Sequence, residues 1–316
     1  MSDLRQIPLF TDQPDKVEDL HQQTRLSHTF ALFQRHLARE GKSEHTVTAF
    51  TSDLQLLAEH SGDDTAIGSF TTTDLNEFLA WLENGRGVPC SRKSYARRVT
   101  TLKVFFKWLH SVGAIAHDPA RTILQRSGPA PLATVLNPAE MRQSIDYAKG
   151  LNRGEKPDAR PELLLRLLLD TAIKKGETAA LKPDHIDRSA PQHPVLVVRH
   201  RIHNVYKERR IALDPEWLSL LDDYIAQYKP KDALFTCTSR NLEYILEAVG
   251  EGAELPVKLS FEMLRWTSAV RDYRAGTEPE AIRDKLGLSD ASWHETFAKI
   301  KRLTELQMAD EARLGG

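Results

Sequence analysis

The sequence is poor in cysteine, because only Cys90 and Cys237 occur among its 316 residues and they form no C-x-x-C pair. This scarcity excludes a disulfide scaffold and a cysteine-rich zinc site. The twelve histidines form no H-E-x-x-H motif, since Ala298 stands where His294 would need its partner. We therefore expect neither a bound metal nor a cofactor.

Long apolar segments are also missing. No uninterrupted run approaches the roughly 20 residues that a membrane-spanning helix needs, and the N-terminus, MSDLRQIPLF, lacks the apolar stretch of a secretory signal. The sequence therefore predicts a cytoplasmic protein with no membrane association.

The chain has no excess of charge of either sign. Its 43 Lys and Arg against 44 Asp and Glu give a net charge of −1. This balance argues against indiscriminate binding to polyanions, but it does not exclude a localised basic surface. The distribution of charge along the chain is therefore more informative than the sum.

The length predicts two domains. Residues 1–26 are polar, so we expect a mobile tail, and the helical period of apolar residues starts after it. The helical first domain covers residues 27–121. The segment Q-R-S-G-P-A-P-L would break any helix, which predicts a linker over 122–135 and a second domain over 136–316.

The last helix of the first domain, from Ser91 onwards, combines an apolar face with a basic one. The apolar residues are spaced by three or four and share one side of the helix; they are Tyr95, Val99, Leu102, Phe106 and Leu109. Cations occupy a separate arc about 140° wide, and residues 91–110 include no acidic side chain. These cations are Arg92, Lys93, Arg97, Lys103 and Lys107.

Two interpretations of the basic arc are open. Lysine-rich helix faces are often simply solvated, whereas a face with five cations and no carboxylate also suits contact with DNA phosphates. We favour phosphate contact. Since neither Lys93 nor Arg97 belongs to the apolar face, we expect that both can be replaced by alanine without loss of the fold.

The second domain is predicted to be mostly helical with one small sheet. V-L-V-V and R-R-I-A-L-D are typical of two short strands joined by a polar turn. Further helices are expected at 215–228, 239–249, 260–275, 278–286 and 292–312. The fold class is therefore mainly α with a small β-sheet.

Five motifs, in order and in register, make the sequence similar to the tyrosine recombinases, the family of phage integrases and Xer proteins. The first domain has S-E-H-T-V-T-A-F-T-S-D-L and K-S-Y-A-R-R-V-T-T-L-K-V-F-F-K-W-L, which resemble the family's helical core-binding, SAM-like domain. The second has L-L-L-D-T-A-I-K-K-G-E-T-A-A-L-K, L-R-W-T-S-A-V and L-G-L-S-D-A-S-W-H-E-T-F, which resemble its catalytic-type α+β domain.

The resemblance implies a reaction that this chain is poorly equipped to perform. In the family a tyrosine attacks a DNA phosphodiester, two arginines hold the phosphate, a hairpin lysine protonates the leaving oxygen, and histidines assist. Of the corresponding positions only Arg265 keeps its residue type. The remaining ones are Lys174 and Asn204 for the first arginine and the lysine, Glu262, Trp266 and Leu288 for the histidines, and Phe297 for the tyrosine.

These substitutions predict an inactive homologue. Phe297 has no oxygen to form the covalent intermediate, and the last tyrosine in the chain is Tyr273. Lys174 cannot offer the bidentate fork of an arginine. A Glu262 carboxylate about 4 Å from a phosphate would repel it by roughly 4 kcal/mol at an effective dielectric near 20. A tyrosine donated by a different partner chain stays a remote alternative.

Three functions are compatible with these observations. The first is a nucleoid-associated protein that binds duplex DNA without cleaving it. The second is an architectural or protein-interaction partner of recombination or replication proteins with weak DNA contact, and the third, weaker, is an active recombinase with relocated groups. If the protein binds duplex DNA without cleaving it, the cations of the second domain would hold phosphates; they are Lys174, Lys207, Arg209, Arg210 and Arg265.

Both ends of the chain carry candidate contacts with proteins. Gln6, Leu9 and Phe10 lie in a pentapeptide, Q-I-P-L-F, that resembles the short peptide by which bacterial replication and repair proteins hold the sliding clamp. The alternative is a segment folded back on the protein. At the C-terminus, the family resemblance implies a helix that docks into a neighbouring subunit; packing on its own domain is equally open. The residues concerned are Ile300, Leu303, Leu306 and Met308.

Overall fold

The computed structural model describes residues 14–123, 131–153, 155–202 and 205–314, and it divides into two compact units, Met1–Pro129 and Ala130–Gly316. Gln6, Leu9 and Phe10, and residues 124–130 of the predicted linker, lie outside the described residues. No helix within the described ranges is long and apolar enough to cross a membrane.

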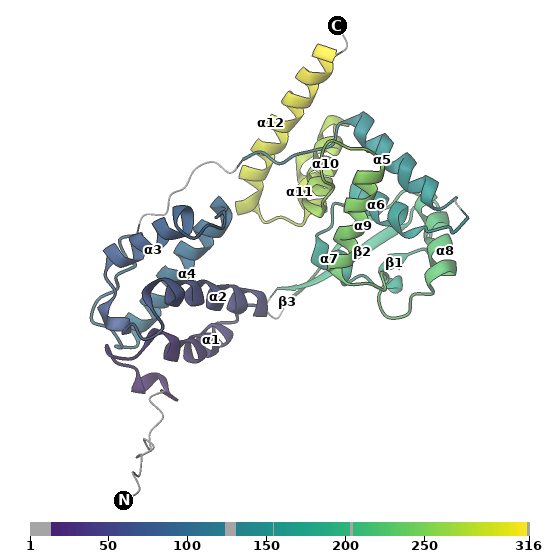
Figure 1. The fold of residues 1–316 in the computed structure, drawn as a ribbon. Coiled ribbons are helices and arrows are strands. Elements are labelled where there is room, and N and C mark those ends of the chain that lie inside the picture. Colours follow the sequence, from purple (N-terminus) through teal and green to yellow (C-terminus); the bar gives the residue numbers. More distant parts are fainter. Residues whose placement is uncertain (1–13, 124–130, 154, 203–204, 315–316) are drawn as a thin grey trace, which may run out of the picture. The chain divides into compact units, whose positions relative to one another are not determined.

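The described residues of the first unit, 14–123, form four α-helices with short 3-10 turns (Figure 1). Two helix starts follow the local sequence. The Ser43 hydroxyl accepts a hydrogen bond from the Thr46 backbone N–H at 3.2 Å, and Ser91 does the same for Ser94 at 3.1 Å. Such caps satisfy backbone donors that have no partner within the helix. The helices are α1 (Phe30–Arg39), α2 (Glu44–Ser61), α3 (Thr72–Asn84) and α4 (Arg92–Ser111).

Helix α4 supplies much of the core of the first unit. The five apolar residues expected on one face are buried, which confirms the predicted orientation of this helix. Phe105 also points inward, and its ring meets those of Phe33 and Phe106 edge-on at 5.1 Å. Aromatic pairs of this geometry are favourable beyond their buried area. The side of α4 opposite this core is left for the cations.

The second unit is mainly helical and contains a three-stranded antiparallel sheet in the order β1-β2-β3 (Figure 1). The predicted hairpin is confirmed, with β2 (Val195–Ile202) paired to β3 (Val205–Ala212). The sequence did not indicate β1 (Ile186–Asp187), which has only two residues. The helices are α5 (Pro138–Leu151), α6 (Arg160–Thr171), α7 (Lys175–Ala179), α8 (Glu216–Tyr228), α9 (Ser239–Gly252), α10 (Phe261–Arg274), α11 (Pro279–Leu286) and α12 (Asp290–Leu314).

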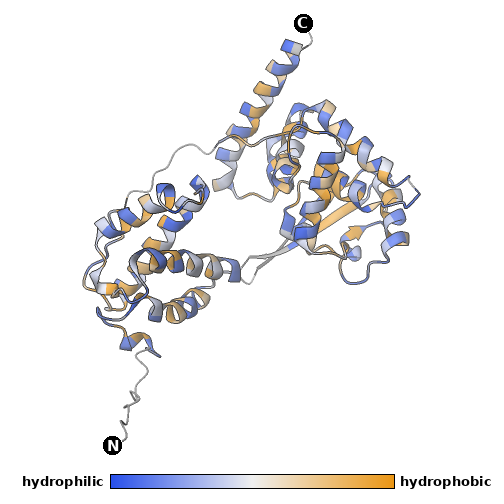
Figure 2. Ribbon diagram, viewed as in Figure 1, coloured by the Kyte–Doolittle hydropathy of each residue, from blue (hydrophilic) through white to orange (hydrophobic). Residues whose placement is uncertain are grey.

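Helix α6 lies at the centre of the second unit. Its leucines at 163–165 and 167–169 are all at most 1% exposed. A helix that is apolar all round must be covered on every side, and α5, α8, α9 and α10 contact it. Hydrophobic residues gather where these elements meet (Figure 2).

A second apolar cluster in this unit joins α10, α11 and α12, and we call it the C-terminal cluster. Its buried members are Ala172, Ala269, Val270, Ile282, Leu286, Trp293, Ile300 and Leu303. Because the family's catalytic positions 265–266, 288 and 297 lie in or between these helices, this cluster sets the surroundings of the candidate site.

Candidate nucleic-acid interface

Arg265, the one position where the catalytic residue type is kept, is occupied by internal contacts. Its guanidinium donates hydrogen bonds to the carbonyl oxygens of Ala172 and Leu286. Burial lowers the pKa of Arg265 to about 10, and nearby Arg209 adds to this effect while Glu177 opposes it. Two protein carbonyls therefore take hydrogen bonds that a phosphate would need.

Arg209 was predicted to hold a phosphate, but the structure ties it to Glu177. Its Nη1 and Nη2 atoms lie 2.9 and 2.8 Å from the two carboxylate oxygens, and Nε donates to the Lys285 carbonyl at 3.2 Å. Only 11% of the Arg209 side chain is exposed. Gly287, at φ +60°, allows this approach, because a Cβ there would lie 2.7 Å from Nη1. Arg209 thus serves as an internal link between α7, β3 and α11.

Lys174 is an exposed cation of this region. Its backbone N–H donates to Glu177 Oε2 at 2.8 Å at the start of α7, while its ammonium makes no hydrogen bond or ion pair with the described residues. Partial burial lowers the pKa of Lys174, Glu177 raises it, and the positive charges of Arg265 and Arg209 lower it further. The Glu177 carboxylate thus accepts hydrogen bonds from the Lys174 backbone and the Arg209 side chain.

The remaining hairpin predictions have different outcomes. Asn204 and the side chain of Lys207 lie outside the described residues, so their predicted roles stay predictions. Arg210 forms an ion pair with Asp187 at 2.7 Å, although 55% of its side chain is exposed. Hydrogen bonds from the Ser189 hydroxyl and backbone N–H, and then from Arg210, lower the pKa of Asp187 to about 2. Arg210 therefore carries a compensated charge.

Apolar packing occupies the position of the nucleophile. The Phe297 ring stacks on Trp293 at 5.0 Å between centroids and meets Tyr273 edge-on at 5.5 Å. The Lys301 ammonium lies 5.0 Å from the centre of the Phe297 ring. Phe297 is thus partly buried in contact with three side chains.

Two further substituted positions join the same packing. Trp266 and Leu288 are partly buried against the C-terminal cluster, as is Phe297. Glu262, by contrast, is exposed in the first turn of α10, where a carboxylate is favoured by the helix dipole. Three polar catalytic positions of the family are therefore filled by side chains that stabilise one apolar cluster.

On the first unit, four of the five predicted cations are free of ion pairs. No acidic partner is found for them within the described part of the chain; they are Arg92, Lys93, Lys103 and Lys107. Because they share one arc of α4, their charges add to a single basic surface, which we call the α4 basic face.

Arg97, the fifth cation, is bonded to Asp53 of α2. Its Nε lies 3.0 Å from Oδ2 and its Nη2 lies 2.7 Å from Oδ1, and Asp53 is 2% exposed. The expectation that Arg97 can be removed without affecting the fold is therefore wrong, because its loss leaves a buried carboxylate poorly compensated. The signal was present in the sequence: Asp53 interrupts the apolar stripe formed by Phe50, Leu54 and Leu57.

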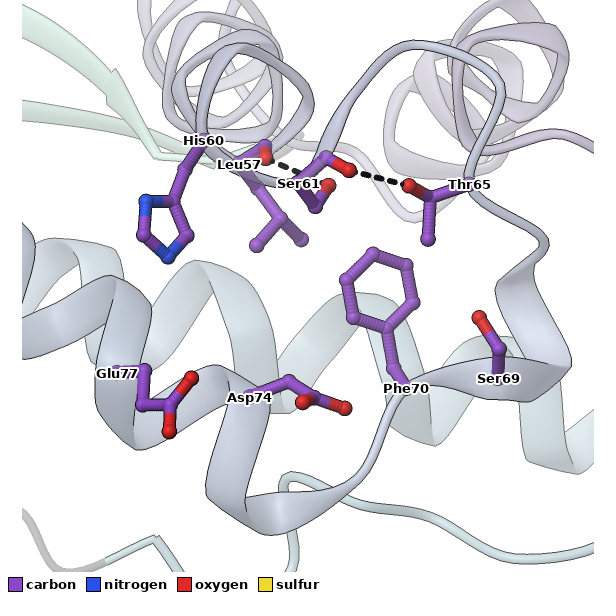
Figure 3. Close-up of a pocket in the computed structure, with 8 residues that line it drawn as sticks. All are labelled: Leu57, His60, Ser61, Thr65, Ser69, Phe70, Asp74 and Glu77. Carbon is purple, nitrogen blue, oxygen red and sulfur yellow. Dashed lines mark hydrogen bonds between the residues drawn. The ribbon is translucent and has the colours of Figure 1, made fainter.

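Charge in the first unit is segregated along the chain. Residues 43–85 contain eight Asp and Glu and no Lys or Arg, whereas residues 86–121 contain eight Lys and Arg and a single acid. A pocket of about 340 Å³ between α2 and α3 belongs to the acidic part (Figure 3). It is lined by Leu57, His60, Ser61, Thr65, Ser69, Phe70, Asp74 and Glu77. Its carboxylates would repel DNA, which leaves α4 as the surface suited to a polyanion.

The C-terminal helix packs on its own unit along much of its length. Ile300 and Leu303 are 0% and 5% exposed. Farther along, Arg274 donates to both carboxylate oxygens of Glu311 at 2.8 and 2.7 Å. Of the residues predicted to dock on a neighbour, only Leu306 and Met308 are exposed, at 38% and 58%. Packing on the same domain therefore accounts for Ile300 and Leu303, and self-association stays a prediction.

Comparisons with known proteins agree with this architecture. Residues 30–113 match the family model described as phage integrase, N-terminal SAM-like domain. The tyrosine recombinase XerC of Mycobacterium sp. (strain KMS) is 30% identical over 287 residues, which cover 88% of this chain and 93% of that protein. Tyrosine recombinase XerD of Listeria innocua serovar 6a (strain ATCC BAA-680 / CLIP 11262) is 21% identical over 281 residues, 84% of this chain and 92% of that protein.

Solved structures show the same fold. The XerH site-specific recombinase bound to palindromic difH substrate, in a post-cleavage complex, matches with a TM-score of 0.69 and 16% identity over 92% of this chain and 84% of that chain. A lambda integrase dimer bound to a COC' core site matches with a TM-score of 0.66 and 16% identity, covering 86% and 77%. The mainly α fold class with its small sheet is thereby confirmed.

Proposed function

Because this chain belongs to the Xer-like tyrosine recombinase family, we propose that it binds duplex DNA through the α4 basic face and does not cleave it. The observation that carries the second half of this proposal is the packing of Phe297, at the position of the nucleophile, against Trp293, Tyr273 and Lys301. A phenyl ring has no oxygen that could attack a phosphodiester.

Tyr273 is the remaining candidate for a substitute nucleophile. It follows Arg265 by eight residues on α10, and its ring meets Phe297 edge-on at 5.5 Å. The Arg265 guanidinium, however, donates to the carbonyl oxygens of Ala172 and Leu286, so a phosphate beside Tyr273 would lack the donor that should stabilise its developing charge. This engagement of Arg265 argues against the alternative of an active recombinase that uses Tyr273.

The other substitutions at the family's catalytic positions also argue against DNA cleavage. Removal of one preorganised donor to a transition-state oxyanion typically lowers a rate by about 100- to 1000-fold. In this chain Arg265 is engaged by carbonyls and the histidine positions hold Glu262, Trp266 and Leu288. These losses support a protein from which cleavage chemistry has been removed.

The support for DNA binding is electrostatic. Four cations on one helix arc have no ion pair among residues 14–123, 131–153, 155–202 and 205–314, and each can neutralise a phosphate and release a counterion. The XerH and lambda integrase structures similar to this chain contain DNA substrates. The near-zero net charge of the whole chain does not oppose this proposal, because its acidic and basic residues are segregated in the first unit.

One experiment tests binding and cleavage on the same sample. The full chain is incubated with duplex DNA carrying a nick that would trap a covalent intermediate, and portions are run on native and on denaturing gels. We expect a mobility shift on the native gel and no protein-linked DNA on the denaturing gel. A covalent adduct would overturn the inactive assignment, and its loss in the Tyr273→Phe variant would identify the nucleophile.

A second candidate function is supported by the state of the second unit. Arg209, Arg210 and Arg265 are all engaged by protein groups, so this unit offers fewer cations to DNA than expected. An architectural or protein-interaction role for the second unit, with DNA contact confined to the first, fits this observation. Absence of any native shift at low salt would favour that role over DNA binding.

A further inference from the structure

The Asp53 carboxylate of α2 contacts three polar side chains of α4. It accepts hydrogen bonds from Arg97 Nε and Nη2, and from the Thr101 hydroxyl at 2.9 Å. The Nε atom of Arg98 lies 3.5 Å from the same carboxylate. A buried carboxylate needs such donors to satisfy its oxygens, and the two hydrogen bonds from Arg97 hold that side chain in one orientation.

The contact with Asp53 uses only one edge of the Arg97 guanidinium. A guanidinium has five N–H donors in a planar fork, and Asp53 accepts from the edge formed by Nε and Nη2. Nη1 makes no hydrogen bond with the described residues, and 43% of the side chain is exposed. The outer edge, formed by Nη1 and the second N–H of Nη2, therefore remains able to donate two parallel hydrogen bonds.

Arg97 differs from the lysines of the α4 basic face in charge as well as in rigidity. Asp53 lies 2.7 Å from Arg97 and offsets part of its positive charge, although Arg98 shares the same carboxylate at 3.5 Å. Lys93, four residues earlier on the same side of α4, has no ion pair with the described residues. Attraction to phosphate depends on net charge, whereas recognition of a base edge depends on the pattern of donors. A partly compensated fork that is held in one orientation is suited to the second task.

We propose that Arg97, positioned by Asp53, reads a guanine through the paired acceptors N7 and O6 in the major groove, while the lysines beside it contact the backbone. Arginine and guanine form the commonest specific contact of this kind. The proposal rests on the proposed DNA binding, and it adds that the first unit has a sequence preference determined by one arginine. Asp53 is then a positioning residue, since it acts on DNA through Arg97.

The chain contains a matched control in Arg98. It is the next residue of α4 and approaches the same carboxylate, but only 11% of its side chain is exposed. Arg98→Lys therefore perturbs the same buried charge cluster without removing a donor that could reach DNA. Arg97→Lys keeps the charge but loses the planar fork.

The test starts with selection of duplexes from a random-sequence pool by the full chain. We expect enrichment of a guanine at one position, and replacement of this guanine by 7-deazaguanine, which lacks the N7 acceptor, should weaken binding about 10-fold, in line with the value of a bidentate contact. Arg97→Lys should abolish the preference for guanine over 7-deazaguanine, while Arg98→Lys should keep it.

The salt dependence of duplex affinity shows whether Asp53 positions Arg97 for DNA or only stabilises the fold. Asp53→Asn should remove the guanine preference and steepen the slope of log affinity against log salt by up to about 0.9, because the charge of Arg97 becomes available to a phosphate. A structural role alone predicts lower affinity for all duplexes with no steeper slope. If Asp53→Asn does not fold, the Arg97→Lys and 7-deazaguanine measurements still decide whether Arg97 reads the guanine.

The failures of the two proposals are distinguishable. Absence of any duplex binding contradicts the proposed function itself. Binding without an enriched guanine, or a guanine preference that survives Arg97→Lys, leaves DNA binding in place and overturns only the assignment of Arg97 as the residue that reads it.

Discussion

Phe297 stacks on Trp293 with 5.0 Å between the ring centroids and 24° between their planes. The two residues are four positions apart on α12, so their side chains lie on the same face of this helix. A ring at the nucleophile position has thus become part of a local apolar contact, and its contribution to the protein is structural.

Restoring the missing hydroxyl should not restore activity. In the Phe297→Tyr variant, and also when it is combined with Lys174→Arg and Glu262→His, we expect no covalent adduct with a nicked duplex, because Asn204 and Leu288 remain. The measurement is a denaturing gel after incubation with DNA. Thermal unfolding of each variant serves as the control for folding, and an adduct formed by Phe297→Tyr alone would show that the other positions are still competent.

The ion pair between Glu177 and Arg209 should contribute measurably to stability. Both side chains are largely buried, at 13% and 11% exposed, and removal of one partner of a buried pair costs about 3–5 kcal/mol. We expect Glu177→Gln to lower the free energy of urea unfolding at neutral pH by a few kcal/mol. Glu243→Gln, at the ion pair with Lys175, is the control at a more exposed pair, whose side chains are 31% and 44% exposed, with an expected effect of at most about 1 kcal/mol.

The same pair predicts a pH dependence. Burial raises the pKa of Glu177, but the Arg209 hydrogen bonds, the Lys174 N–H and the charges of both residues lower it more, so its pKa in the folded state lies below the usual range. A depressed carboxyl pKa stabilises the fold above the unfolded pKa of about 4.3. This contribution is lost as pH falls through the lower folded value, so wild type and Glu177→Gln should converge below pH 4. A constant difference down to that pH would contradict this origin.

The packing of α12 on its own unit predicts that substitutions at its exposed end do not change the oligomeric state. Because Leu306 and Met308 are exposed while Ile300 is buried in its own unit, we expect Leu306→Glu with Met308→Glu to leave the mass by light scattering unchanged. Ile300→Ala should destabilise the protein by about 2–4 kcal/mol. A fall in mass of the double variant would instead show that this end of the helix docks on a second copy.

Elements that depend on local periodicity were predicted from the sequence. Contacts between side chains far apart in the chain were not. The buried face of α4, the hairpin and the ends of most helices follow from apolar spacing and cap residues. The partners of three predicted phosphate contacts do not. Arg97 is bonded to a residue 44 positions away, Arg209 to one 32 positions away and Arg265 to one 93 positions away.

Such pairs are set by how helices from different parts of the chain meet, which periodicity cannot supply. A cation on a polar arc has the same sequence pattern whether it is free, as Lys93 is, or tied to a buried acid, as Arg97 is. The one available signal was an acid on an apolar stripe, since a buried Asp53 requires a cationic or hydroxyl partner.

The decisive measurement for DNA binding through α4 is the salt dependence of duplex binding by the full chain and by the Lys93→Ala/Lys107→Ala variant. Both lysines are exposed and have no ion pair with the described residues. At about −0.9 per neutralised phosphate, four unpaired cations predict a slope of log affinity against log salt near −3.6 for the wild type, and the double variant should lose about 1.8 of it, for all sequences. An unchanged slope and affinity in the double variant, or no binding by the wild type at low salt, would contradict DNA binding through α4.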